Sequence, residues 1–154
     1  MDFSVVRLFH NACFWAPLCA WLAAQFTKMI FGLLRTKRID FSYLVSTGGM
    51  PSAHSSLVSA LATSVGVVSG FESPVFAIAL ALAILVMFDA ATVRRAAGLQ
   101  ARLLNEMIDE LFKQHRFSER KLAELLGHTR LEVFMGMVMG IIIGLLVVSM
   151  HAAF

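Results

Sequence analysis

Cysteine is scarce in this chain of 154 residues, which contains only Cys13 and Cys19. The two lie six positions apart in an apolar stretch, on different faces of a helix, so the sequence predicts neither a disulfide nor a metal-binding pair there. A Walker-type phosphate loop, a carboxylate cluster for a metal ion, internal repeats and low-complexity segments are also lacking. These absences argue against a P-loop nucleotide-binding protein and a repeat protein.

Hydrophobic residues are abundant instead. They make up 58% of the chain, compared with about 45–50% in soluble domains, and the mean hydropathy is +0.77. At this length we expect a single domain over residues 1–154, with a core made by helix contacts inside lipid. The composition therefore predicts an all-α, helical integral membrane protein.

Four apolar stretches are each close to the roughly 20 residues that a helix needs to cross a bilayer. The predicted spans cover about residues 9–34, 52–70, 74–92 and 131–153. The first lacks the polar cleavage region of a signal peptide, so we interpret it as a retained span. Leucines and other apolar residues recur every three or four positions between the third and fourth spans, which predicts an amphipathic interfacial helix over about 98–113 and a shorter one over about 118–127.

Basic residues are concentrated in two segments, about 35–50 and 93–130, whereas the 70–74 link carries only Glu72. The positive-inside rule places those two segments in the cytoplasm and the link and both termini on the other side, with Arg7 as weak contrary evidence. The net charge is +3, and its distribution does not indicate nucleic-acid binding. The basic segments would instead suit contact with anionic lipid head groups or a phosphorylated substrate. The absence of a targeting extension favours a bacterial inner membrane.

A cluster of small and polar residues precedes the second span. Gly48 and Gly49 let the chain turn sharply, Pro51 suits the first position of a helix, and His54 then falls in its first turn. The amides and the dipole of such a turn favour an anion, and an imidazole exchanges a proton near neutral pH. The simpler interpretation is a capped helix with an incidental histidine.

The predicted topology brings several polar and ionisable residues to the cytoplasmic face, and such residues in membrane segments are candidates for function. They are Lys28, Arg35, His54, Asp89, Arg94, Arg95, His128 and Glu132. If the fourth helix starts near Gly127, His128 and Glu132 share a helical face, and the carboxylate would orient the imidazole as a nucleophile. His54 would then protonate the leaving oxygen, while cations and amides hold phosphate.

Alternative roles for these residues remain open. The arginines would also suit snorkelling to lipid phosphates. A metal held by His54 and His128 would need Asp89 and Glu132 as further ligands, so we rank it below phosphate chemistry and expect no metal and no cofactor.

Three glycines repeat every fourth residue in the fourth span, at Gly136, Gly140 and Gly144. Such a stripe lets another helix approach closely. The sequence does not say whether that helix belongs to the same chain, so a homodimer through the stripe is a hypothesis.

At these residues the chain resembles the superfamily of type-2 phosphatidic acid phosphatases and vanadium haloperoxidases. The segment 51–54 is similar to its P-S-G-H motif, Lys28 and Arg35 are similar to K-x6-R-P, and His128 with Glu132 is similar to H-x3-D. Over about residues 10–145 the chain looks more closely like the divergent branch of small membrane proteins. The segments that carry this closer resemblance are 46–55, 89–101, 103–105 and 126–129.

The resemblance implies a metal-independent phosphatase of membrane lipids that acts through a phosphohistidine. His128 would be the nucleophile, Glu132 its orienting partner and His54 the general acid. Lys28 and Arg35, with Ser52 and nearby amides, would hold phosphate. We also expect Gly48 and Gly49 at the phosphate site, with Asp89 and Asn105 in support.

The chain departs from the superfamily pattern at three places. Thr36 replaces the proline, Ala53 replaces the glycine, and Lys121-Leu122 stands where a Ser-Arg pair is expected, so that Arg94 or Arg95 would supply the guanidinium. Two functions therefore remain. The preferred one is a phosphatase of a phospholipid or polyprenyl phosphate, and the alternative is a non-catalytic protein that binds, transports or assembles lipid phosphates.

Overall fold

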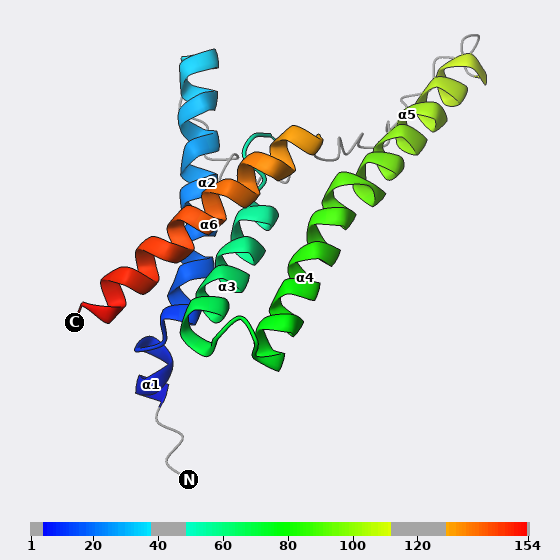
Figure 1. Cartoon of the computed structure of the whole chain (residues 1–154). Helices are drawn as coiled ribbons and strands as arrows, with labels where there is room; N and C mark the ends of the chain where they lie inside the picture. The colour runs from blue at the N-terminus through cyan, green and yellow to red at the C-terminus, as the bar shows by residue number, and fades with distance from the viewer. Residues whose placement is uncertain (1–4, 38–48, 112–128, 154) are drawn as a thin grey trace.

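The chain folds into α-helices throughout the part that the structure describes. The computed structural model describes residues 5–37, 49–111 and 129–153. Its helices are α1 (Val5–Phe9), α2 (Ala12–Thr36), α3 (Ala53–Ser69), α4 (Pro74–Ala91), α5 (Val93–Leu111) and α6 (Arg130–Ala152). Helices α2, α3, α4 and α6 form a bundle, and α5 extends away from it (Figure 1). The predicted all-α membrane fold is confirmed.

Three described helices are long and apolar enough to cross a membrane. They comprise residues Ala12–Leu34 of α2, Pro74–Ala91 and Arg130–Ala152. The fourth apolar helix, α3, has 17 residues, which corresponds to about 26 Å at 1.5 Å per residue. It contacts α2, α4 and α6, so the shortest apolar helix lies at the centre of the bundle.

Local sequence sets the helix ends. Asn11 caps α2 by accepting a hydrogen bond from the Cys13 amide at 2.9 Å, which separates α2 from the short helix α1 and moves the start of the predicted first span from residue 9 to Ala12. Ser73 caps α4, and Pro74 occupies its first turn. The α3–α4 connection is therefore a tight hairpin that contains Glu72.

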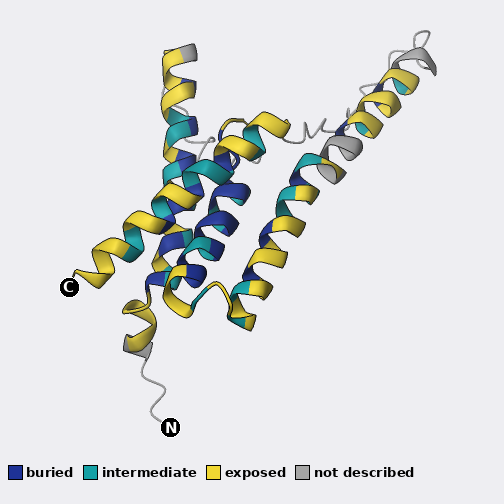
Figure 2. Cartoon of the chain, viewed as in Figure 1, coloured by how far each residue is buried: buried dark blue, intermediate teal, exposed yellow. Residues whose placement is uncertain are grey.

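Small residues face inwards and large ones face outwards. The buried surface of α3 consists mainly of serine, alanine and glycine, and Figure 2 shows α3 as the most deeply buried helix. Ile78, Leu85 and Phe88 on α4 are exposed on the outer surface of the bundle. This distribution is typical of a protein in lipid. Burial of a large apolar side chain gives no hydrophobic stabilisation there, because lipid tails are equally apolar, and small residues let the helices approach closely.

The glycine stripe of α6 packs on α3 of the same chain. A Cβ atom at Gly136 or Gly140 would overlap the carbonyl oxygen of Ser52 or Ser56, and one at Gly144 would lie 3.0 Å from the Ala60 carbonyl oxygen. The stripe is thus filled within the chain by α3. The homodimer through these glycines stays a hypothesis.

The amphipathic helix begins earlier than expected. Thr92 alone separates α4 from α5, and its amide still donates to the Phe88 carbonyl at 3.0 Å. α5 then continues in roughly the direction of α4, with Leu99, Leu103 and Met107 exposed (Figure 1). Its predicted position along the membrane interface stays a prediction. The predicted helix over about 118–127 lies outside the described residues.

Candidate functional site

The first residues of α3 and α6 are tied together at one end of the bundle. The Ser52 amide donates to the Glu132 carbonyl at 3.0 Å, and Gly136, one turn further along α6, lies against the Ser52 carbonyl. Because both contacts involve backbone atoms, they fix the two helix N-termini relative to each other. Two positive dipole ends therefore meet at one place.

The turn before α3 differs from its prediction in one detail. Gly49 has a positive φ of 87°, as the predicted sharp turn requires, and the Met50–Pro51 peptide bond is cis. Pro51 stands before the cap rather than at the first helical position, because Ser52 is the N-cap and Ala53 the first helical residue. His54 lies in the first turn, as predicted.

Ser52 is completely buried, and its hydroxyl oxygen organises this turn. It accepts hydrogen bonds from the Ser55 amide at 3.4 Å and from the Ser55 hydroxyl at 3.0 Å. Neither bond uses the hydroxyl hydrogen of Ser52 itself. His54 is half-buried, and its Nδ1 atom is shielded from solvent.

Lys28 brings a positive charge from α2 to the same end of the bundle. Its side chain is only 3% exposed, and the Glu132 carboxylate acts on the ammonium electrostatically. A lysine in a membrane helix is costly unless it faces a partner or a ligand. Lys28, Ser52, His54 and Glu132 thus form the part of the predicted site that the structure brings together, called here the polar cluster.

The fourth helix starts later than the predicted shared face of His128 and Glu132 assumed, and that arrangement stays a prediction because His128 lies outside the described residues. α6 starts at Arg130 with Thr129 as its N-cap. The Glu132 carboxylate accepts a hydrogen bond from the Thr129 amide at 2.9 Å, and the Thr129 hydroxyl accepts one from the Glu132 amide at 3.3 Å. Glu132 therefore completes a capping box, a role that this threonine and glutamate spacing also encodes.

The other predicted residues lie on α4 and α5 or are not described. Asp89 is half-buried in the last turn of α4, at the same end of the bundle. Asn105 is buried on α5, whose contacts among the described helices are with α4 alone, so it is not brought to the polar cluster. Gly48 and the side chains of Arg35, Arg94 and Arg95 are outside the described part of the chain.

Several buried polar residues were missed by the sequence-based prediction, and Gln25 is the one on the same helix as Lys28. Gln25 is 4% exposed and lies three residues before Lys28, hence on the same face of α2. The sequence feature that could have identified Gln25 is its polar side chain within an otherwise apolar stretch. Within the described residues, no group of three or more His, Cys, Asp and Glu side chains could hold a metal ion.

Comparison with known proteins agrees with this architecture. Residues 9–143 match a family described as the divergent PAP2 family. The chain is also 36% identical over 151 residues to a Bacillus subtilis (strain 168) protein described as "Uncharacterized membrane protein YuiD", with 91% of this chain and 96% of that protein covered. No solved structure matches the chain.

Proposed function

The chain belongs to the divergent PAP2 family, and from this we propose that it is a metal-independent phosphatase that removes the terminal phosphate from a membrane lipid. The substrate class would be a phospholipid phosphomonoester, such as phosphatidate or phosphatidylglycerophosphate, or a polyprenyl phosphate. The reaction would take place at the cytoplasmic face of a bacterial inner membrane.

The observation that carries the proposal is the buried cation beside two helix N-termini. Lys28 is almost fully buried, and the backbone bond from Ser52 to Glu132 holds the starts of α3 and α6 together. Amides at a helix start and a desolvated ammonium both favour a phosphate dianion. Arg35, Arg94, Arg95, Gly48 and Gly49 are proposed to complete the phosphate site, with Asp89 and Asn105 in support.

The proposed chemistry uses two histidines in sequence. An imidazole nitrogen of His128 attacks phosphorus, the bond to the lipid oxygen breaks, and His54 gives its proton to the leaving alcohol. Water then attacks the phosphohistidine, His54 takes a proton from it, and inorganic phosphate leaves. In this scheme Glu132 acts by capping α6 and by its charge near Lys28.

A second candidate is a protein that binds or transports lipid phosphates without turnover. The specific observation in its favour is the replacement of the expected Ser-Arg pair by Lys121 and Leu122. If neither Arg94 nor Arg95 supplies the absent guanidinium, the pocket would bind phosphate but stabilise the transition state poorly.

Phosphate release from purified protein separates the two candidates. We expect release from at least one lipid phosphate in the presence of a chelator, with KM raised in Lys28→Met, which removes the charge and keeps most of the length. Lys28→Arg retains the charge and should lose less affinity. Binding of the same lipids without any phosphate release would exclude the enzyme and favour the second candidate.

The orientation can be tested separately through the α3–α4 hairpin. We expect Glu72→Cys, in a variant that lacks Cys13 and Cys19, to react with a membrane-impermeant maleimide from outside the cell. The reason is that the 70–74 link lacks basic residues and follows the C-terminal end of α3, whereas Ser52 caps the N-terminal end of that helix. Labelling only after the cytoplasmic side is opened would reverse the proposed topology.

A further inference from the structure

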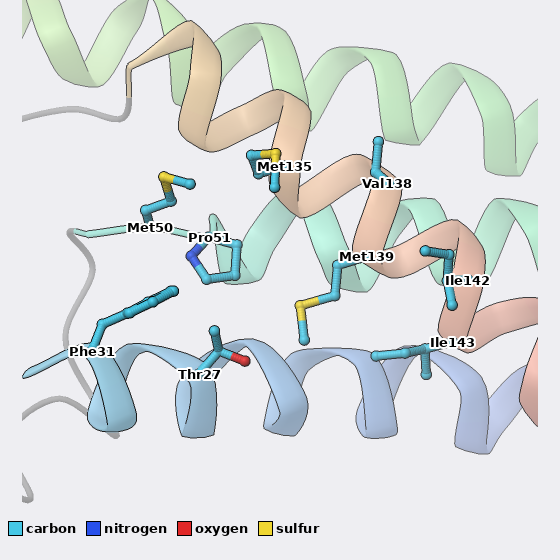
Figure 3. Close-up of a pocket in the computed structure, with 9 residues that line it drawn as sticks. All are labelled: Thr27, Phe31, Met50, Pro51, Met135, Val138, Met139, Ile142 and Ile143. Carbon is cyan, nitrogen blue, oxygen red and sulfur yellow. The ribbon is translucent and has the colours of Figure 1, made fainter. Parts of the chain in front are cut away.

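An apolar cavity of about 420 Å³ lies between α2 and α6, next to the turn that precedes α3. Figure 3 shows Phe31 and Thr27 projecting from α2, Pro51 at one end, and Met139 projecting from α6 towards α2. The volume falls within the range of about 300–1,000 Å³ that is typical of ligand pockets. It is therefore large enough for part of a small ligand.

The walls of the cavity offer almost no polar group. Thr27 is the one lining residue with a polar side chain, and its hydroxyl donates to the Ala23 carbonyl of its own helix at 2.7 Å. Three of the other lining residues are the flexible methionines Met50, Met135 and Met139. Such a cavity disfavours water and head groups, and it adapts to the shape of an apolar ligand.

The cavity adjoins the polar cluster through neighbouring residues. Thr27 directly precedes Lys28, and Pro51 directly precedes Ser52. Along α6 the lining extends from Met135 to Ile143, or about 12 Å at 1.5 Å per residue. It begins about 7.5 Å from the start of α6, so within a hydrocarbon core of roughly 30 Å its near end lies in the leaflet at the polar end of the bundle.

The cavity also opens to the outside of the bundle. Phe31 is 53% exposed and Ile142 is 52% exposed, although both line the cavity. Both belong to the predicted membrane spans, so the opening faces lipid. An apolar chain can therefore enter sideways from the same leaflet without passing through water.

We propose that the cavity between α2 and α6 binds the hydrocarbon chain of a lipid phosphate whose head group lies at Lys28, Ser52 and His54. The inference rests on the proposed function for the identity of the head group. An apolar slot that ends beside a buried cation and two helix N-termini matches an amphiphile with a long chain and an anionic head. A neutral or zwitterionic lipid would fill the slot but bring less negative charge to Lys28 than a phosphomonoester does.

The test is photolabelling, which does not require turnover. The probe is a phosphatidate with a diazirine near the middle of one acyl chain, in vesicles of phosphatidylcholine. The control probe carries the same chain on phosphatidylcholine. We expect phosphatidate to label Phe31, Met139 or Ile143 several-fold more than the control probe does, and we expect Lys28→Met to remove this preference.

Two variants on α6 localise the chain. Met139→Trp fills the cavity and should reduce phosphatidate labelling of Phe31 several-fold, whereas Met150→Trp makes the same change at an exposed position that lines none of the described cavities. If Met139→Trp does not fold, Ile143→Phe reduces the same cavity by a smaller amount. Undiminished labelling in a folded cavity-filling variant, or equal labelling by both probes, would overturn the proposal.

The outcomes also separate this inference from the proposed function. Head-group-dependent labelling without phosphate release would support the binding site for the hydrocarbon chain and contradict the proposed phosphatase activity. Phosphate release with equal labelling by the two probes would support the phosphatase activity and contradict the binding site for the hydrocarbon chain.

Discussion

Replacement of His128 by alanine is expected to abolish phosphate release from lipid phosphates, with a loss in kcat of more than about 10⁴-fold, because the proposed nucleophile is gone. His54→Ala should lower kcat by about 10²–10⁴-fold, the usual contribution of a general acid or base. Both variants should still bind the lipid, since Lys28 and the N-termini of α3 and α6 are unchanged. Release of inorganic phosphate measures the first effect, and lipid binding measures the second.

The covalent intermediate distinguishes the two histidines. A substrate with an acidic leaving group needs no proton from His54 in the first step, so a His54→Ala protein should accumulate an acid-labile phosphohistidine, whereas a His128→Ala protein should form none. His151→Ala is the matched control, since this exposed histidine lies at the opposite end of α6. A phosphohistidine that persists in His128→Ala would assign the nucleophile to another residue.

The second large effect is expected from Gly140, the middle glycine of the α6 stripe. A Cβ atom there would overlap the Ser56 carbonyl oxygen and would come within 2.9 Å of the Ser59 Cβ atom. Neither neighbour can yield easily, because the carbonyl belongs to the α3 backbone and the Ser56 hydroxyl binds the Ala20 carbonyl on α2 at 3.0 Å. We expect Gly140→Ala to lower the free energy of unfolding by about 1–3 kcal/mol and Gly140→Leu by more.

Thermal unfolding in a mild detergent, followed by the fluorescence of Trp15 and Trp21, measures this loss. The control is Val148→Ile, which also adds carbon to α6, at a position that borders an open cavity instead of a backbone. Equal melting temperatures for Gly140→Leu and Val148→Ile would mean that α3 and α6 are not in the close contact described. If Gly140→Leu changed the oligomeric state without lowering the melting temperature, the glycine stripe would instead form a contact between two chains.

Much of the fold could be predicted because each span carries its own hydropathy and its own cap. The boundaries of α4 and α6 differ by about a residue from the predicted 74–92 and 131–153. The first span begins at Ala12 because Asn11 caps α2. The prediction placed its start at residue 9 because the segments on both sides of Asn11 are mostly apolar. The glycine stripe predicted close packing but not the partner, since every apolar helix offers an equally apolar surface.

Part of the membership of the candidate site could be predicted from the sequence, and its membrane side stays a prediction. Lys28, Ser52, His54 and Glu132 stand out in sequence as polar residues at the borders of apolar runs. The capping of α6 by Glu132 went unrecognised because the helix was assumed to start near Gly127, before His128. The cavity had no sequence signal at all, because its residues, from Thr27 to Ile143, come from three segments that are individually ordinary membrane helix or turn.

The sequence by itself determined that this protein is a helical membrane protein of the divergent PAP2 family, because hydropathy, caps and short motifs are local properties. Only the tertiary structure decided that α3 is the central helix, that the glycines of α6 contact α3 within the chain, and that an apolar cavity adjoins Lys28 and Ser52. The physical reason is that all apolar helix surfaces are solvated equally well by lipid tails. Helix partners in a membrane are therefore selected by shape and by a few backbone hydrogen bonds, such as the one from Ser52 to Glu132, and these exist only once the helices have come together.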